Sequence, residues 1–309
     1  MLIRNPPTQI VDGLWMLGTN EYPLYLLRCG EEAAVFEGGT GAMGPVLSEQ
    51  LEQTGVAPGA VKQLIVTHAH PDHVMAVPML RELFPAVTVL AGEVAVKTLA
   101  AEKAVAFFGK IDQALTGALL EAGSIEPRHQ PAPLGEATIG VDRVLGQGDT
   151  VVVGAATFNV LATPGHSPCS LSFHEPGARI LLISDATGYY MPEHEAWWPN
   201  YFDGYGAYVE SMRRLAELDA DVLCLSHNAV VTGADDVRAY FSGAIAATEE
   251  YHKRIVDALR GGTDPRQLAE QLGNEVHEKT QLLPAEFFQK NCGLMVKLSM
   301  KHEGIGQES

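Results

Sequence analysis

The stretch Thr67-His68-Ala69-His70-Pro71-Asp72-His73 concentrates three histidines and one aspartate in its last six positions. It overlaps the end of residues 63–67, Gln-Leu-Ile-Val-Thr, a run typical of a buried strand. His68 and His70 are two positions apart on an extended segment, so both imidazoles point the same way and can reach one metal ion. Asp72 and His73 follow where the chain turns into a helix predicted over residues 72–84, so they can face a second ion.

Three further predicted strands also end in a candidate metal ligand. Residues 158–162 lead to His166, residues 180–183 to Asp185, and residues 222–225 to His227. Each of these residues taken alone has an ordinary alternative as a hydrogen-bonded surface or core residue. Four strand ends that deliver five histidines and two aspartates to one rim instead favour a metal site.

Strand and helix patterns extend in both directions from these motifs. The first third alternates β-rich runs with turn residues, residues 93–120 form one or two helices with a break at Gly109, and a hairpin is expected around residues 146–149. Strands return up to residue 226, and the pattern after Gly233 is wholly helical. These patterns predict an α/β fold, with two mixed sheets packed face to face and helices outside.

Composition and charge limit the classes of partner. The 309 residues are 46% hydrophobic and 19% charged, as expected for a globular chain. Their formal charge of -17 disfavours nucleic acid and anionic lipid surfaces as partners. No apolar stretch reaches the roughly 18 residues of a membrane helix, and Pro6 and Pro7 interrupt any signal-peptide core. A cytoplasmic location is therefore expected.

This ordered set of motifs resembles the metallo-β-lactamase superfamily, including its glyoxalase II-like hydrolases. The resemblance covers residues 10–233 and implies an αββα sandwich with one or two metals at the sheet edge. It assigns the ligands of the first metal as His68, His70 and His166, those of the second as Asp72, His73 and His227, and Asp185 as the bridge between them. The aspartate at the bridging position, unlike the cysteine of true zinc β-lactamases, argues against antibiotic hydrolysis.

Two positions depart from the pattern of the superfamily. Ser184 precedes the bridging aspartate and Ser226 precedes the last histidine, where the superfamily usually has glycine. Both serines lie beside ligands and replace none. They therefore bear on local backbone geometry rather than on metal binding.

The C-terminal part resembles a narrower subgroup. Residues 205–215 and the Leu282–Phe287 segment before a final helix look like the quinolone-signal response thioesterase and its relatives, which lay C-terminal helices over the active site. This resemblance predicts a catalytic domain of the metallo-β-lactamase fold over residues 1–234. It also predicts a helical extension over residues 235–309 that covers the active site.

The implied reaction is hydrolysis of an ester-type carbonyl, with a thioester or lactone as the leading substrates. Two cations roughly 3.5 to 4 Å apart lower the pKa of a bridging water and so supply hydroxide. Asp185 would hold the cations at this separation, and Asp72 would orient the hydroxide or return a proton to the leaving group. The two catalytic residues expected are therefore Asp72 and Asp185.

Two other functions remain open at this point. One is a regulatory protein that binds a ligand and keeps a metal site with little turnover. The other is a mononuclear iron sulfur dioxygenase of the same fold, which would use only His68, His166 and Asp185. Oxygen uptake with a glutathione persulfide would identify the dioxygenase, and site mutants that keep their biological effect would favour the regulatory protein.

An aromatic segment follows the third ligand strand. Eight aromatic side chains fall within residues 189–208, which suggests a wall or lid for a partly apolar substrate. The alternative is a minor hydrophobic core between this segment and the C-terminal helices, and Phe107, Phe108 and Met295 are expected only to pack. The residues predicted to contact substrate are Tyr189, Trp197, Trp198, Tyr201, Phe202 and Phe287.

The expected cofactors are two divalent metal ions. A ligand set of nitrogen and oxygen suits zinc, iron or manganese without choosing among them. The expected partner is a small-molecule acyl substrate, and the oligomeric state is left open, with a homodimer as one alternative. Neither nucleic acid nor a membrane is expected as a partner.

Overall fold

The computed structural model describes residues 1–306, and two seven-stranded sheets form its centre. The strands of the first sheet, in spatial order, are β2 (Thr8–Val11), β3 (Leu14–Gly18), β4 (Pro23–Cys29), β5 (Glu32–Phe36), β6 (Val61–Ile65), β7 (Thr88–Gly92) and β8 (Arg143–Leu145). Those of the second are β1 (Leu2–Ile3), β16 (Val230–Thr232), β15 (Val222–Cys224), β12 (Ile180–Leu182), β11 (Leu171–Glu175), β10 (Ala156–Ala162) and β9 (Thr150–Val153). A separate ribbon pairs β13 (Tyr189–Met191) with β14 (Ala196–Trp198). Both large sheets are mixed, because each contains parallel and antiparallel neighbours.

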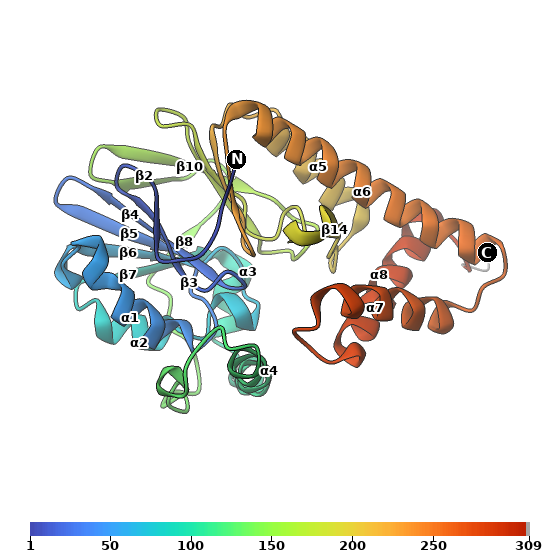
Figure 1. Cartoon of the computed structure of the whole chain (residues 1–309), viewed down its shortest axis with the longest axis horizontal. Coiled ribbons are helices and arrows are strands. Elements are labelled where there is room, and N and C mark those ends of the chain that lie inside the picture. Colours follow the sequence, from blue (N-terminus) through green and yellow to red (C-terminus); the bar gives the residue numbers. More distant parts are fainter. Residues whose placement is uncertain (307–309) are drawn as a thin grey trace.

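Helices cover the outer faces of the two sheets. The α-helices of residues 1–306 are α1 (Met43–Thr54), α2 (Val77–Leu83), α3 (Glu93–Leu99), α4 (Glu102–Glu121), α5 (Tyr205–Ala216), α6 (Ala234–Arg260), α7 (Pro265–Thr280) and α8 (Ala285–Glu303). Short 3-10 helices are η1 (Pro58–Ala60), η2 (Pro71–His73), η3 (Pro127–His129) and η4 (Pro192–His194). Helices α1 and α3 contact the first sheet and α6 contacts the second, so the layers follow the order αββα (Figure 1).

Apolar side chains from both sheets form the inner core. The ring of Phe36 on the first sheet lies 5.0 Å from that of Phe158 and 5.4 Å from that of Phe173 on the second, measured between centroids. Tilted and edge-to-face arrangements are the ones that aromatic quadrupoles favour. This packing holds the sheets face to face, and with them the strand ends that carry the candidate ligands.

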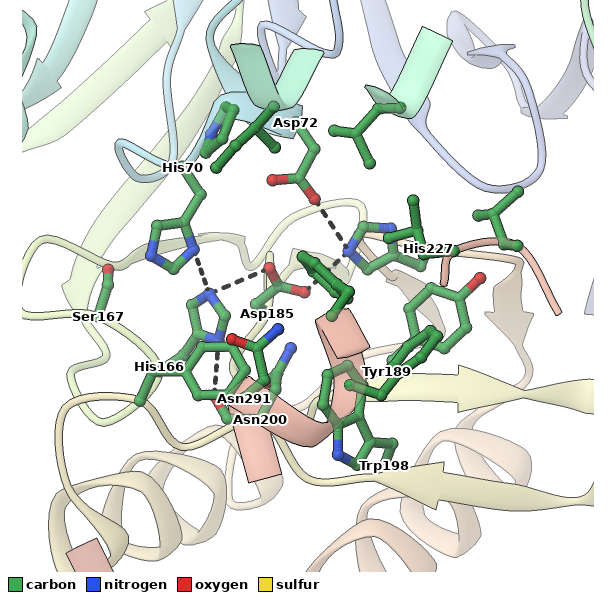
Figure 2. Close-up of a pocket in the computed structure, with 18 of the residues that line it drawn as sticks. His70, Asp72, His166, Ser167, Asp185, Tyr189, Trp198, Asn200, His227 and Asn291 are labelled. Carbon is green, nitrogen blue, oxygen red and sulfur yellow. Dashed lines mark hydrogen bonds and ion pairs between the residues drawn. The ribbon is translucent and has the colours of Figure 1, made fainter. Parts of the chain in front are cut away.

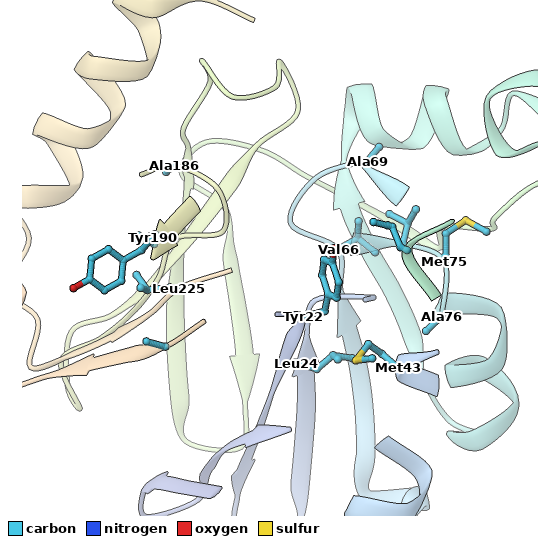
Figure 3. Close-up of a cluster of buried hydrophobic side chains, with 14 of the residues drawn as sticks. Tyr22, Leu24, Met43, Val66, Ala69, Met75, Ala76, Ala186, Tyr190 and Leu225 are labelled. Carbon is cyan, nitrogen blue, oxygen red and sulfur yellow. The ribbon is translucent and has the colours of Figure 1, made fainter. Parts of the chain in front are cut away.

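A second core lies between the sheets and their helices. Leu24 on β4 and Met43 at the start of α1 are both fully buried and lie together on the outer face of the first sheet, while Tyr190 and Leu225 belong to the other half (Figure 3). Helix α1 ends at Gly55, which adopts a left-handed φ of 66°. Glycine takes this conformation without the penalty of a Cβ, so it is a usual C-terminal residue for a helix.

The hairpin expected around residues 146–149 is absent from the described structure. Strand β8 pairs with β7 in the first sheet, whereas β9 pairs with β10 in the second. Leu145, Val151 and Val153 are all buried in the inner core, so the two strands face each other across it. The turn therefore carries the chain between sheets, which a local turn pattern does not reveal.

The break predicted at Gly109 is also wrong. The chain forms two helices here, but they separate at Ala100 and Ala101, and Gly109 lies inside α4. A glycine within a helix costs only about 1 kcal/mol relative to alanine. Burial of Val105, Phe108 and Leu119 on one face of α4 outweighs that cost.

Helix α6 starts on the second sheet, and the last two helices, α7 and α8, lie beyond the sheets. Asp264 caps α7 by accepting hydrogen bonds from two backbone N–H groups, and α7 and α8 pack against each other at the C-terminal end (Figure 1). The final three residues of the predicted extension, 307–309, lie outside the described residues. Within residues 1–306, no helix is both long enough and apolar enough to cross a membrane.

Asp112 on α4 gives a stability prediction. Burial raises the pKa of this carboxyl to about 6, while a hydrogen bond from the Gly41 N–H at 2.7 Å partly opposes the shift. An unfolded aspartate has a pKa of about 3.9, so between about pH 4 and 6 the folded state holds a proton that the unfolded state has lost. The contribution of Asp112 to the unfolding free energy therefore falls as the pH rises through this window.

We expect Asp112→Asn to remove this pH dependence. The unfolding free energy of the variant minus that of wild type should be larger at pH 8 than at pH 4, by on the order of 2 kcal/mol. Urea denaturation of both proteins at the two pH values measures the change. Asp257→Asn, at an exposed position on α6, is the control, and a pH-independent difference between Asp112→Asn and wild type would contradict the prediction.

Candidate metal centre

The seven predicted ligands meet at one rim of the sandwich. His68 and His70 follow β6, Asp72 and His73 lie in η2, and the other three follow β10, β12 and β15: His166, Asp185 and His227. Figure 2 shows His70, Asp72, His166, Asp185 and His227 turned toward one another across the site. The structure thus brings together side chains that are up to 159 positions apart in the sequence, from His68 to His227.

A close approach of the backbone positions His166. The preceding residue, Gly165, has a φ of 126°, and a Cβ added to it would lie 2.3 Å from the Cα of Tyr208 on α5. Only glycine avoids both the strained dihedral and this overlap. The glycine that precedes His166 is therefore required for steric reasons.

The first group of ligands is formed by His68, His70, His166 and Asp185. One ligand atom from each lies within 4.8 Å of the others. Nδ1 of His70 lies 3.1 Å from Nε2 of His68 and 2.8 Å from Nε2 of His166. Three imidazole nitrogens that converge in this way can donate their lone pairs to one cation.

The second group is formed by Asp72, His73 and His227, whose ligand atoms meet the same 4.8 Å limit. Oδ2 of Asp72 lies 3.4 Å from Nε2 of His73 and 3.8 Å from Nε2 of His227. Nε2 of His73 is buried, yet it has no hydrogen-bond partner within the described part of the chain. A buried nitrogen without a partner is costly unless something binds it, so these residues fit a metal ion.

Asp185 lies between the two groups. Its Oδ2 is 3.5 Å from Nε2 of His68 and 3.3 Å from Nε2 of His166, both of the first group. The same oxygen is 3.2 Å from Nε2 of His73, and Oδ1 is 3.2 Å from Nε2 of His227, both of the second group. One carboxylate therefore faces both sets of ligands, as a bridging ligand must.

Protonation is divided unequally among these side chains. Burial lowers the pKa of His70 to about 3, and burial together with the neighbouring histidines places the pKa of His68 well below its usual value. Burial opposes ionisation of His73 and His227, but Asp72 and Glu37 raise the pKa of His73, and Asp185 raises that of His227. The imidazoles of His68 and His70 in the first group are thus neutral, and the second group attracts positive charge. Both are properties of a cation site.

The outer nitrogens of the histidines fix which nitrogen faces the site. Nδ1 of His166 donates to the backbone oxygen of Asn200 at 2.8 Å, and Nδ1 of His227 donates to that of Glu21 at 2.6 Å. A carbonyl accepts only, so both rings carry a proton on Nδ1 and turn Nε2 toward the site, where it can bind a cation in the neutral ring.

The two serines that depart from the superfamily pattern contact ligands. Ser184 has a φ of 49°, a left-handed conformation that explains why glycine is usual there, and its Oγ lies 3.1 Å from Nδ1 of His68. Ser226 Oγ donates a hydrogen bond to Oδ1 of Asp185 at 2.6 Å. The serines therefore orient the ligands beside them.

Glu37 is a residue that the sequence analysis missed. It is 3% exposed, and its Oε2 accepts a hydrogen bond of 2.8 Å from Nδ1 of His73. The next residue, Gly38, donates to the backbone oxygen of His73 at 2.9 Å, and a Cβ there would lie 2.5 Å from this oxygen. The only local signal is an acidic residue directly after a buried strand and before two glycines.

We expect Glu37→Gln to weaken metal binding without removing a ligand. A neutral amide holds the His73 ring less firmly than a carboxylate does, and loss of such an outer partner typically lowers metal affinity about 10- to 100-fold. Competition with a chromophoric chelator measures the affinity. Glu52→Gln, exposed on α1, is the control, and unchanged affinity in Glu37→Gln would contradict the role assigned to Glu37.

A cavity of about 450 Å³ opens onto the two groups. It is lined by five of the seven ligands, His70, Asp72, His166, Asp185 and His227, and His68 and His73 lie behind them. Of the six predicted substrate-contact residues, four line it: Tyr189, Trp198, Phe202 and Phe287. The first two are labelled in Figure 2.

Trp197 and Tyr201 do not line this cavity, which corrects their assignment as substrate contacts. The Trp197 ring lies 5.5 Å from that of Tyr240 on α6, and Tyr201 is fully buried and bonded to Ser299 on α8 at 2.8 Å. Adjacent residues of a strand face opposite sides, so Trp198 reaches the cavity while Trp197 packs outside it. These two side chains belong to the minor core between the aromatic segment and the C-terminal helices.

Phe107 and Phe108 on α4 were expected only to pack, yet both line the cavity. Phe108 is buried, but Phe107 is 58% exposed. Two adjacent phenylalanines on a helix point about 100° apart, so they cannot both be buried in one core. This spacing could have indicated from the sequence that one of the pair lies outside the core.

A third group of possible ligands joins α6 to α8. It consists of His252, His302 and Glu303, and the second and third of these are exposed. Glu303 already forms an ion pair with Arg260 at 2.8 Å, and His252 stacks on Tyr205 with ring centroids 3.6 Å apart. These contacts account for the group as a link between helices.

The sequence matches one family model and is similar to proteins named as hydrolases. The family model described as the metallo-beta-lactamase superfamily matches residues 23–227, about two thirds of the chain. A hydroxyacylglutathione hydrolase of Cereibacter sphaeroides is 29% identical over 143 residues, which cover 46% of this chain and 39% of that protein. A probable metallo-hydrolase of Burkholderia pseudomallei is 31% identical over 127 residues, covering 41% and 35%. The chain thus spans less than half the length of these two relatives.

Solved structures share the whole architecture. A metallo-beta-lactamase family protein of Thermus thermophilus superposes with a TM-score of 0.63 at 21% identity, covering 96% of this chain and 95% of that one. A subclass B3 metallo-beta-lactamase of Bradyrhizobium japonicum gives a TM-score of 0.57 at 17% identity, covering 84% and 96%. These likenesses confirm the predicted fold.

Proposed function

This chain belongs to the metallo-beta-lactamase superfamily, and on that premise we propose that it hydrolyses an ester-type carbonyl with two divalent metal ions. A thioester or a lactone is the favoured substrate. The relatives named hydroxyacylglutathione hydrolase support an ester-type bond. An aspartate rather than a cysteine at position 185 supports a substrate other than an antibiotic.

The position of Asp185 carries the proposal. Its two oxygens lie 3.2–3.5 Å from four histidine nitrogens that belong to both ligand groups. A site for one metal would need only one of these groups. The second group, with the partnerless Nε2 of His73, supports a dinuclear centre.

When bound, a pair of divalent cations polarises a carbonyl oxygen and lowers the pKa of a water toward neutrality. Asp72 is suited to the proton transfers of the reaction, because it lines the cavity and its side chain is 23% exposed, against 3% for Asp185. Despite burial, His73 and His227 lower the pKa of Asp72, so it is a carboxylate at neutral pH. It would accept a hydrogen bond from the attacking water and return the proton to the leaving group.

The sulfur dioxygenase alternative is less well supported. It would use His68, His166 and Asp185 alone, yet Nδ1 of His70 lies only 2.8 Å from Nε2 of His166. The regulatory alternative keeps the same site without turnover. Activity measurements distinguish both alternatives from the proposal.

We expect metal-dependent hydrolysis of a thioester or lactone. The test combines elemental analysis of protein purified without added metal with assays on acyl thioesters, lactones and phosphodiesters. Removing the metal should abolish turnover, and adding it back should restore turnover. Full activity in metal-free protein, or activity on phosphodiesters alone, would overturn the proposal.

A further inference from the structure

The cavity over the metal centre has two facing apolar walls. Helix α4 supplies Phe107, Phe108, Ile111 and Leu115. Ile111 and Leu115 lie about one and two helical turns after the adjacent pair Phe107 and Phe108, so the four side chains border the cavity along the helix. The opposite wall comes from α8 and the segment before it, with Leu283, Phe287, Phe288 and Leu294. The carbonyl-activating groups lie between these walls, so any ester that reaches them passes an apolar surface on each side.

Several of these wall residues are exposed although they are large and apolar. Phe107 is 58% exposed, Phe287 37% and Leu294 38%, and the two phenylalanines are the only exposed ones in residues 1–306. Phe288 is buried by contrast, with its ring 5.4 Å from Phe287 and 5.3 Å from Trp198. Covering apolar surface releases about 25 cal/mol per Å², so a ligand that bridges Phe107 and Phe287 gains affinity from both.

The side chains that line this cavity disfavour a charged acyl group. Among the described residues no lysine or arginine lines it, and its polar side chains away from the ligands include Ser167, Asn200 and Asn291. Basic side chains instead line an adjoining cavity, which contains Arg4 and Lys279. Away from the metal ligands, an acyl group that carries a carboxylate would meet no basic side chain in the described lining, which is costly in an apolar site.

We propose that the cavity binds the acyl part of the substrate as an extended, uncharged hydrocarbon group between α4 and α8. This inference rests on the proposed hydrolysis of an ester-type bond. Phe107 and Phe287 are the specificity-determining residues, one on each wall. Selectivity for the acyl group then depends on apolar area buried along its length.

A series of acyl thioesters tests the inference on the metal-loaded enzyme. Straight-chain N-acetylcysteamine thioesters from acetyl to octanoyl should show kcat/KM rising by up to about 4-fold per methylene. The succinyl thioester, which carries a charged acyl group, should fall at least about 10-fold below the butyryl thioester. Equal rates for acetyl and octanoyl, or a preference for succinyl, would overturn the inference while leaving the hydrolase proposal intact.

Two variants and one control locate the effect. Phe107→Ala and Phe287→Ala should each lower the octanoyl-to-acetyl ratio of kcat/KM about 10-fold, because each removes one wall contact. Val94→Ala, at an exposed apolar position on α3 that does not line the cavity, should leave the ratio unchanged. An equal ratio in wild type and both phenylalanine variants would overturn the assignment.

A binding measurement separates this inference from the proposed function. Isothermal titration with 2-decanone and 2-butanone, uncharged ketones that need no turnover, should give tighter binding of the longer ketone with a negative heat-capacity change. Phe107→Ala should weaken the binding of 2-decanone about 10-fold, and Val94→Ala should leave this binding unchanged. Chain-dependent ketone binding without hydrolysis of any thioester or lactone would refute the hydrolase proposal and support the acyl site. Binding of neither ketone, in protein that hydrolyses all thioesters equally, would refute the acyl site alone.

Discussion

Replacing Asp185 by asparagine is expected to lower kcat/KM at least about 1,000-fold and to remove bound metal. The substitution keeps the shape of the side chain and leaves one amide oxygen. It removes the negative charge, however, and places an N–H donor where the second oxygen faces histidine nitrogens. Because the two oxygens contact both groups of ligands, a single change should disrupt the whole centre.

Elemental analysis and steady-state kinetics on the same preparation measure both effects. Asp257→Asn is a matched control, since the carboxylate of this exposed aspartate on α6 forms an ion pair with Lys253, far from the ligands in the sequence. It should keep the metal content and activity of wild type. Asp185→Asn protein with the metal stoichiometry of wild type and activity within about 3-fold would show that the carboxylate does not bridge a metal pair.

Removing the metal from the wild-type protein is expected to lower Tm by on the order of 10 °C. A ligand that binds only the folded state adds about 4 kcal/mol to the unfolding free energy at 1,000 times its Kd. Without a cation, the half-buried carboxylate of Asp72 and the buried one of Asp185 stay near one another, and Nε2 of His73 keeps no hydrogen-bond partner within residues 1–306. The folded state therefore loses stabilisation at this rim.

Thermal unfolding with and without excess chelator, followed by restoration of the metal, measures the change. Asp185→Asn serves as the reference, because it should start near the lower Tm and respond little to chelator. A similar shift in both proteins would mean that the chelator acts elsewhere. An unchanged Tm in wild-type protein that carries metal would show that the centre contributes nothing to stability.

Local patterns identified the seven candidate ligands correctly as neighbours, because each follows a strand or a turn with a recognisable signal. The H-x-H-x-D-H motif is continuous, and His166, Asp185 and His227 each follow an apolar run. Glu37 had no comparable signal, since its role depends on the distance between its Oε2 and Nδ1 of His73. A contact made across 36 positions cannot be read from composition or periodicity.

The aromatic segment shows the same limit. Density of aromatic residues predicted an apolar wall, and Tyr189, Trp198 and Phe202 do line the cavity. The neighbours Trp197 and Tyr201 face α6 and α8 instead. Which of two adjacent aromatics faces a cavity depends on how the ribbon of β13 and β14 is rotated against those helices, and only packing determines that rotation.

Local patterns were enough to predict the α/β class, the general succession of strands and helices, and the residue types that gather at one rim. These features follow from local periodicity and from spacings that bring ligands to strand ends. Only the packed chain shows that β8 and β9 lie in different sheets, that Glu37 contacts His73, and that α4 and α8 form two walls of the cavity. Those outcomes depend on the burial of surfaces far apart in the chain, and burial is a property of the packed molecule rather than of any segment within it.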